Sequence, residues 1–139
     1  MEVITIEKDI NVFYVTAESF PDKIMDAYQL LHSRITASND ERMYFGISQP
    51  NPQGTIIYKA AAEELEPGEA EKYGCESFTI RKGKYICIDI KNHMSDAASI
   101  GNVFQKLIAQ PGIDPKGYCL EWYRNYTDPD VKCLVGLAS

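Results

Sequence analysis

The chain has 139 residues, 45% of them hydrophobic and 24% charged, which is the usual size and composition of one globular domain. Its net charge of −6 and its 14 scattered Lys and Arg residues provide no positive field for phosphates, so nucleic-acid binding by this chain alone is not expected. No apolar run approaches the length of a membrane span, and the acidic N-terminus lacks the basic start of a signal peptide. We therefore expect a single domain, residues 1–139, that acts in the cytoplasm without a membrane partner.

The first half of the chain predicts a strand, a helix and two further strands. β-branched and aromatic residues dominate 10–17 and favour a strand there, while residues 1–8 show no clear pattern and are left unassigned. In Pro21–Ile35 apolar residues recur at i, i+3, i+4 and i+7, which predicts a helix with one buried face. Two strands are then expected at 43–48 and 55–62, joined by the Pro- and Asn-containing turn QPNPQG.

The second half repeats this order. Alternating isoleucines predict a strand at 85–91, and a second amphipathic helix is expected from Asp96 to Ala109, with Ser95 as its N-cap. Strands follow at 118–125 and 131–137, joined by the turn YTDPD. The buried faces of the two helices correspond at an offset of 76 residues: Ile24, Ala27, Tyr28 and Leu31 match Ile100, Val103, Phe104 and Leu107.

These elements predict an α+β fold built from two β-α-β-β units. The halves are expected at about 9–63 and 78–137. The segment between them, about 64–77, is acidic, contains Gly and Pro and lacks a sustained apolar period. We interpret it as an exposed connection.

The four cysteines, Cys75, Cys87, Cys119 and Cys133, form no C-x-x-C pair and no dense framework. Free thiols in a reducing cytoplasm fit this spacing. Zinc sites usually take their ligands in closely spaced pairs, and neither the cysteines nor the isolated His32 and His93 provide one. We expect no metal and no cofactor, and we interpret both histidines as surface or capping residues.

The segment GYCLEWYRNY places a carboxylate, Glu121, in the middle of an apolar strand, where Glu is disfavoured. Alternation puts Leu120 and Trp122 on one face and Glu121 and Tyr123 on the other. If the apolar face packs against a helix, the mixed face presents a carboxylate beside a phenol, as a pocket for a cationic or hydrogen-bonding aromatic ligand requires. The alternative is that Glu121 points to solvent or pairs with a neighbour such as Arg124.

Aromatic residues are plentiful, and nine tyrosines offer flat apolar walls that each carry one hydroxyl. Most aromatic residues in strands serve the core. The sequence contains no nucleophile elbow, no glycine-rich phosphate loop and no H-E-x-x-H helix. The candidate ligand-binding residues are Glu121, Tyr123, Tyr85, Trp122, Phe45 and Tyr58.

Four stretches of the chain carry a resemblance to a known family: Gly83-Lys84-Tyr85, the helix ending FQKLIAQ, Glu121-Trp122-Tyr123 and the turn TDPD. The first is similar to the G-x-Y strand start, and the third to the E-x-Y strand, of the GyrI-like small-molecule-binding domains. These domains also serve as effector-binding domains of bacterial multidrug-sensing transcription regulators. The chain departs from the family at Asn92-His93-Met94, where a glycine is frequent, and its second helix lacks the frequent Trp.

The resemblance implies a six-stranded antiparallel, barrel-like sheet with two helices. It also implies a ligand groove near the pseudo-twofold junction, with Glu121 as the central carboxylate and Tyr123 beside it. A stand-alone domain that binds a small organic molecule is expected, and regulation of transcription would need a separate DNA-binding partner chain.

Two other functions stay open. Some stand-alone relatives are thought to hydrolyse electrophilic small molecules, and Glu121 would then be the general base and Tyr123 the group that polarises the substrate. Inhibition of a protein such as a topoisomerase would need an exposed patch, which nothing in the linear sequence marks.

Overall fold

The computed structural model describes residues 1–36, 42–93 and 98–138. Within these ranges the chain forms a single antiparallel sheet of eight strands in the order β1-β6-β8-β7-β3-β4-β2-β5. The elements are β1 (Glu2–Ile6), β2 (Ile10–Thr16), α1 (Ile24–Arg34), β3 (Tyr44–Pro50), β4 (Ile56–Glu63), α2 (Glu69–Lys72), β5 (Glu76–Ile80), β6 (Gly83–Ile90), α3 (Ala98–Ile108), β7 (Cys119–Tyr123) and β8 (Val131–Gly136).

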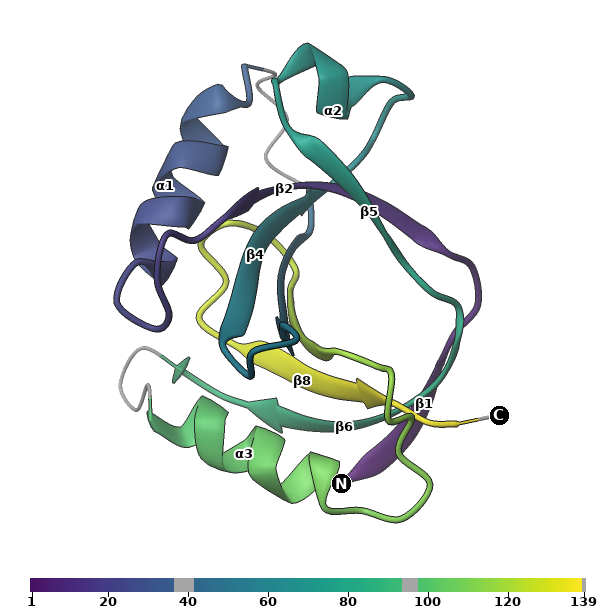
Figure 1. Cartoon of the computed structure of the whole chain (residues 1–139). Helices are drawn as coiled ribbons and strands as arrows, with labels where there is room; N and C mark the ends of the chain where they lie inside the picture. Colours follow the sequence, from purple (N-terminus) through teal and green to yellow (C-terminus); the bar gives the residue numbers. More distant parts are fainter. Residues whose placement is uncertain (37–41, 94–97, 139) are drawn as a thin grey trace.

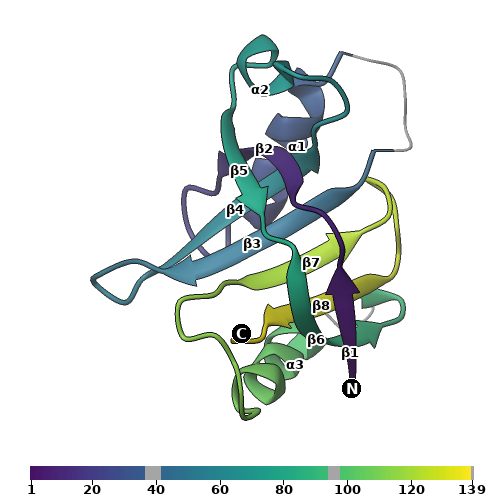
Figure 2. The ribbon, with the colours of Figure 1, turned by 90° about the vertical axis from the view of Figure 1, so that its right-hand side faces the viewer.

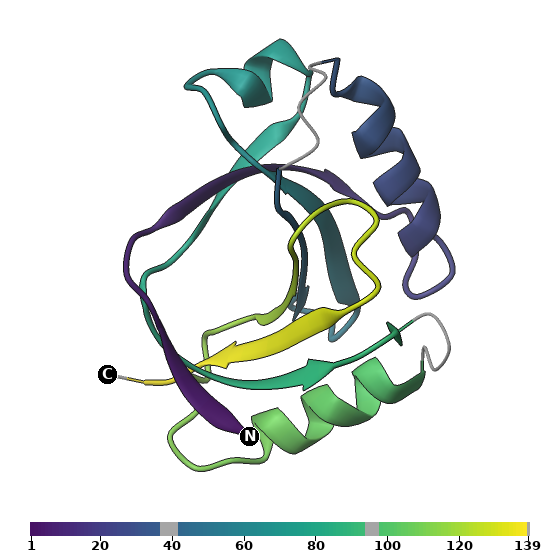
Figure 3. The same cartoon turned by 180° about the vertical axis from the view of Figure 1, so that it is seen from behind.

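The sheet is curled into a half-barrel, with α1 and α3 on its outside (Figures 1 and 3). We call the side covered by these helices the outer face and the side within the curl the inner face. One apolar cluster, which includes Val12, Phe45 and Leu120, fills the inner face. Two more lie on the outer face, one under α1 around Leu31 and one under α3 around Leu107.

The two halves of the chain are related by a pseudo-twofold arrangement. Exchanging β1–β4 with β5–β8 leaves the strand order unchanged when it is read from the other edge. The two central strands are therefore β3 and β7, one from each half, and Figure 2 shows them side by side. The α+β character and the duplication agree with the sequence analysis.

The expected count of six strands and two helices is wrong. The unassigned N-terminus forms β1, which pairs with β6, and the segment 64–77 contains α2 and the first two residues of β5, which pairs with β2. Each half is thus β-β-α-β-β, and the connection is part of the fold. Periodicity missed these elements because α2 is a single turn, and β1 and β5 are short edge strands whose partners are distant in sequence.

Both predicted amphipathic helices are present; α1 is shorter than the expected Pro21–Ile35, and α3 ends at Ile108, one residue before the expected end. Helix α1 buries Ala27, Tyr28 and Leu31, while α3 buries Phe104 and Leu107. The expected N-cap Ser95 and helix start Asp96 lie outside the described residues. Among the described residues, no helix is long and apolar enough to cross a membrane.

A buried ion pair fastens α2 to the sheet. Arg42, just before β3, is 2% exposed and donates to both carboxylate oxygens of Glu69, at 2.8 and 3.0 Å. Glu69 also accepts hydrogen bonds from the backbone N–H groups of Leu65 and Glu66. The Arg42 hydrogen bonds hold the pKa of the Glu69 carboxyl at about 2, so the carboxylate stays charged at neutral pH.

We expect Glu69→Gln to lower the free energy of unfolding by about 3 kcal/mol at pH 7, because it leaves the Arg42 guanidinium buried without its counter-ion. Denaturant titration measures this, with exposed Glu71→Gln as the matched control on the same turn. The pKa of Glu69 is lowered on folding, so its stabilisation is present above the ordinary carboxyl pKa. The difference between wild type and variant should therefore shrink as the pH falls toward 2. Equal stability of the two variants at pH 7 would contradict this role of the pair.

Candidate functional site

The central strand β7 places Glu121 on the outer face, between the regions covered by α1 and α3. Its neighbours across the sheet are Gly46 on β3 and Cys133 on β8. Strand alternation puts Tyr123 on this face and Trp122 on the other, as the sequence predicts. The sequence analysis considered a helix packed on the apolar face of this strand. In the structure the helices cover the face that carries Glu121, and the apolar face lies on the inner side of the curled sheet.

Gly46 creates the space that the site occupies. A Cβ atom at this position would lie 2.1 Å from the Tyr58 hydroxyl oxygen and 2.9 Å from that of Tyr28. Tyr58 is 1% exposed and has no room to retreat. The missing side chain on β3 therefore leaves room for both phenols, of which Tyr58 reaches the carboxylate of the paired residue on β7.

Two tyrosines contact Glu121 directly. The Tyr123 hydroxyl donates to Glu121 Oε1 at 2.5 Å, and the Tyr58 hydroxyl lies 3.2 Å from the same oxygen. Tyr28, from α1, contacts the Tyr58 hydroxyl at 2.8 Å and donates to the Phe45 carbonyl at 2.9 Å. The carboxylate thus lies at the end of a chain of phenols that extends to the helix.

Counting protons shows which form of Glu121 this chain fits. Three contacts join the Phe45 carbonyl, Tyr28, Tyr58 and Glu121, but the two phenols supply only two protons. With Glu121 ionised, one contact has no proton. With Glu121 protonated, the carboxyl donates to Tyr58, Tyr58 donates to Tyr28, and every contact is a hydrogen bond.

Burial also favours the protonated form of Glu121. Glu121 is 8% exposed, and burial raises the pKa of its carboxyl, against the opposing effects of the two phenol hydrogen bonds and of nearby His93. Burial likewise raises the pKa values of Tyr28, Tyr58 and Tyr123, and the Glu121 charge raises them further. The phenols therefore stay protonated, and Glu121 is the group in this cluster that titrates most readily.

The alternative of an exposed or salt-bridged Glu121 is wrong. Arg124 instead pairs with Asp128, with 3.1 Å between Nε and Oδ2. Among the described residues, no Lys, Arg or His nitrogen forms an ion pair with Glu121. The ionised carboxylate is therefore a buried negative charge that no ion pair in that part of the chain neutralises, although nearby His93 favours the charged form.

The six candidate ligand-binding residues do not form one site. Glu121, Tyr123 and Tyr58 come together on the outer face. Phe45 and Trp122 lie on the inner face, with their ring centroids 5.7 Å apart, and Tyr85 belongs to the same inner cluster. The physical reason is strand parity, since a one-residue step along a strand moves a side chain to the opposite face.

Sequence reasoning missed three contributors to the site. Tyr28 was recognised only as a residue of the buried helix face. A tyrosine among the apolar residues of such a face is itself a signal, because a buried tyrosine hydroxyl usually has a hydrogen-bond partner. Gly46, inside a strand, is the usual sign of a close approach. His93, whose ring centroid lies 5.3 Å from that of Tyr123, follows β6 and carries no such signal.

Metal-donor atoms gather at one other place. Oxygen atoms of Glu2 and Asp89 and the sulfur of Cys87 all lie within 4.8 Å of one another, and no other group of three donors is found among the described residues. The Lys132 ammonium already pairs with Asp89 at 3.0 Å, and burial raises the pKa of the Cys87 thiol to about 11. A metal ion would have to displace the ammonium and deprotonate the thiol, so these residues are better described as an ion pair beside a neutral thiol.

No protein-family model and no curated protein matches the sequence. Solved structures share the fold. They include SAV2435 bound to tetraphenylphosphonium (10% identity, TM-score 0.61, 98% of this chain and 91% of that chain) and an integron cassette protein of Vibrio cholerae (11%, 0.69, 98% and 94%). A Staphylococcus aureus protein assigned by prediction to bacterial transcription regulation also matches (12%, 0.61, 97% of each chain). At these identities the matches show a common fold.

We expect Glu121→Gln to be at least as stable as the wild type at pH 8. A carboxyl whose pKa rises on folding stabilises the protein at low pH, and this stabilisation is lost as the pH rises from its unfolded toward its folded pKa. Glutamine stays neutral and fits the same space. Thermal unfolding at pH 4 and pH 8 measures the effect, and the variant's relative stability should increase with pH. A variant that loses stability specifically at pH 8 would mean that the charged carboxylate is stabilised in the fold.

Proposed function

We propose that this chain is a GyrI-like domain that binds a small, aromatic or lipophilic organic cation on the outer face of its sheet, with Glu121 as the counter-ion. The observation that carries this proposal is the buried carboxylate that contacts tyrosine hydroxyls and forms no ion pair with any described residue. A ligand with a positive charge would supply the partner. Only a few polar groups would orient the ligand, as in other small-molecule sites.

Electrostatics favours a cation that carries its charge on an apolar body. In a site shielded from water, the attraction between Glu121 and a cation exceeds its value in solution, and a lipophilic cation loses little hydration when it enters. The rings of Tyr28, Tyr58 and Tyr123 add cation–π contacts. Phe20, which is 44% exposed and stacks on Tyr58 at 5.9 Å between centroids, offers a further aromatic surface at the edge of the site.

The common fold with a protein solved in complex with tetraphenylphosphonium supports the same ligand class. The sequence resemblance to GyrI-like domains, carried by Gly83-Lys84-Tyr85 and Glu121-Trp122-Tyr123, adds to this support. A sensor or scavenger of organic cations is the simplest form of the proposal.

Tetraphenylphosphonium should bind the wild type, and Glu121→Gln should weaken binding at least tenfold, because the amide keeps the shape of the site and removes its charge. Isothermal titration calorimetry measures both affinities, with exposed Glu18→Gln as a control for net charge. Binding by the wild type should strengthen as the pH rises through the raised pKa of Glu121. Unchanged affinity in Glu121→Gln, or binding that ignores pH, would contradict the assignment of Glu121.

A second candidate function, hydrolysis of electrophilic small molecules, is favoured by the raised pKa of Glu121, because a general base works best with a pKa near the working pH. Tyr123 would then polarise the substrate. Incubation with a panel of small epoxides, followed by mass spectrometry, should show diol formation by the wild type and none by Glu121→Gln. Equal rates with wild type and variant would exclude this function for Glu121.

A further inference from the structure

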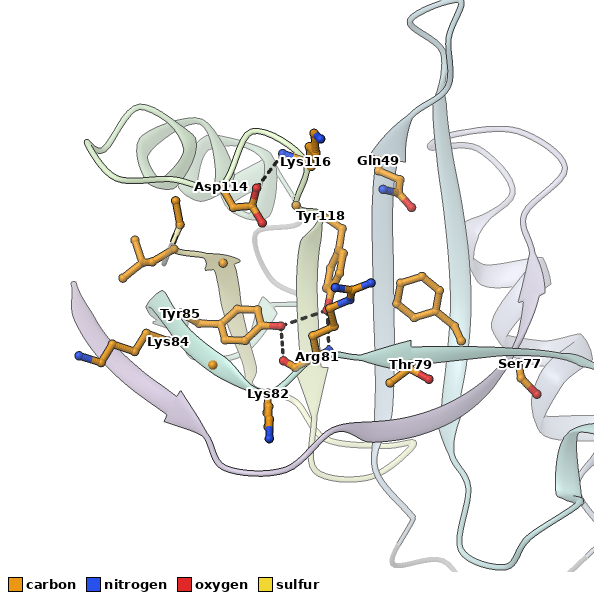
Figure 4. A pocket seen from close by; sticks show the side chains of 16 residues that line it. Gln49, Ser77, Thr79, Arg81, Lys82, Lys84, Tyr85, Asp114, Lys116 and Tyr118 are labelled. Carbon is orange, nitrogen blue, oxygen red and sulfur yellow. Dashed lines mark hydrogen bonds between the residues drawn. The ribbon is translucent and has the colours of Figure 1, made fainter.

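A cavity lies on the other side of the sheet from Glu121, and the proposed function does not use it. It has a volume of about 1230 Å³ and lies where β5, β6, the end of β8 and the segment before β7 meet (Figure 4). Phe78, Tyr85 and Tyr118 line it, and all three belong to the inner-face cluster or pack against it. The cavity is therefore an extension of the inner face that is open to solvent.

The aromatic residues form the walls of the cavity, and their hydroxyl groups are already hydrogen-bonded. The Tyr85 hydroxyl donates to the Arg81 carbonyl at 2.6 Å and lies 3.0 Å from the Tyr118 hydroxyl. The Tyr118 oxygen accepts the backbone N–H of Arg81 at 3.0 Å. Both phenol protons are thus used inside the wall, Tyr85's on the carbonyl and Tyr118's on Tyr85. Phe78 stands edge-to-face with Tyr118, with centroids 5.4 Å apart, so a flat apolar body can lie against these rings.

The charges around the cavity are mainly positive, unlike those of the whole chain. Four cationic residues line it, and none forms an ion pair with any described residue: Arg81, Lys82, Lys84 and Lys116. The lining contains a single carboxylate, Asp114, which accepts the backbone N–H of Lys116 at 2.9 Å. An anion entering the cavity therefore meets a local excess of positive charge.

Arg81 is the cation best placed to hold such an anion. In Figure 4 its guanidinium reaches toward the middle of the cavity beside Tyr118, whereas Lys82 and Lys84 point outward. Its backbone is fixed on both sides, by the bond from its N–H to Tyr118 and by the bond from Tyr85 to its carbonyl. The side chain makes no hydrogen bond within the described part of the chain, which leaves its planar fork free for a carboxylate.

We propose that this cavity binds a flat aromatic carboxylate, with the carboxylate on Arg81 and the ring between Phe78, Tyr85 and Tyr118. Lys116 and the two outward lysines attract the anion without fixing its position. The site is separate from Glu121, because the two lie on opposite faces of the sheet. The chain would then take ligands of opposite charge on its two faces.

The test is a calorimetric titration with 2-naphthoate and its neutral analogue 2-naphthamide. Naphthoate should bind the wild type, the amide at least tenfold more weakly, and Arg81→Gln should weaken naphthoate binding about tenfold or more. Exposed Lys23→Gln, on the other side of the sheet, is the control for the loss of one positive charge. Binding should also weaken with added salt.

Glu121→Gln separates this proposal from the preceding one. It should leave naphthoate binding unchanged, and a saturating concentration of tetraphenylphosphonium should not displace naphthoate. No binding of naphthoate at millimolar concentration would overturn the proposal. It would also be overturned by equal affinities of the wild type and Arg81→Gln, or by loss of naphthoate binding in Glu121→Gln. Failure of tetraphenylphosphonium to bind would leave the naphthoate result intact, so the two sites can fail independently.

Discussion

The structure depends on one constraint, which is that a carboxylate lies buried on the central strand pair of a duplicated sheet. The fold joins its halves through β3 and β7, and Glu121 faces Gly46 across that junction. The absent side chain on one strand gives room for the Tyr58 phenol, which reaches the carboxylate on the other. The pairing of Glu121 with Gly46 turns a packing interface between the halves into a polar site.

The periodic parts of the fold could be predicted from the sequence. Both amphipathic helices stand where their apolar spacing placed them, and β2, β3, β4, β6, β7 and β8 match predicted strands. The elements that were not predicted, β1, α2 and β5, have no clear local sequence pattern. β5 is stabilised by pairing with β2, about 65 residues earlier, and one-turn α2 is held by the Arg42–Glu69 ion pair and by Ala70, which packs in the cluster under α1. Such long-range contacts cannot be inferred from a window of neighbouring residues.

The candidate site was predictable along one strand and unpredictable across strands. Alternation on β7 correctly put Glu121 and Tyr123 on one face, because the period of two is a local property. Tyr58 also lies on that face, whereas Phe45, Trp122 and Tyr85 lie on the other. To identify which aromatic residues on other strands lie near Glu121, one must know the pairing register between the strands. The residue types alone do not give that register. The glycine opposite Glu121 was the informative residue, since it marks where other side chains must enter.

The two faces of the sheet differ in the charges that form no ion pair among the described residues. On the outer face the Glu121 carboxylate is buried among phenols, and on the inner face the Arg81 guanidinium lies at the edge of an aromatic wall with three lysines around it. Under both proposals, rings supply contact area and a charged side chain supplies the ligand's counter-ion. This arrangement favours recognition of the ligand's charge and flat shape over a fixed pattern of hydrogen bonds.

The central claim is that Glu121 is a buried acid whose charge becomes favourable when a cation binds beside it. Carbon-13 NMR of the glutamate carboxyl groups, titrated with and without tetraphenylphosphonium, tests this directly, with Glu121→Gln to assign the signal. The account predicts a pKa above the ordinary glutamate value in the free protein and a lower pKa in the complex, as linkage between proton and cation requires. An ordinary pKa that the cation does not change would contradict it.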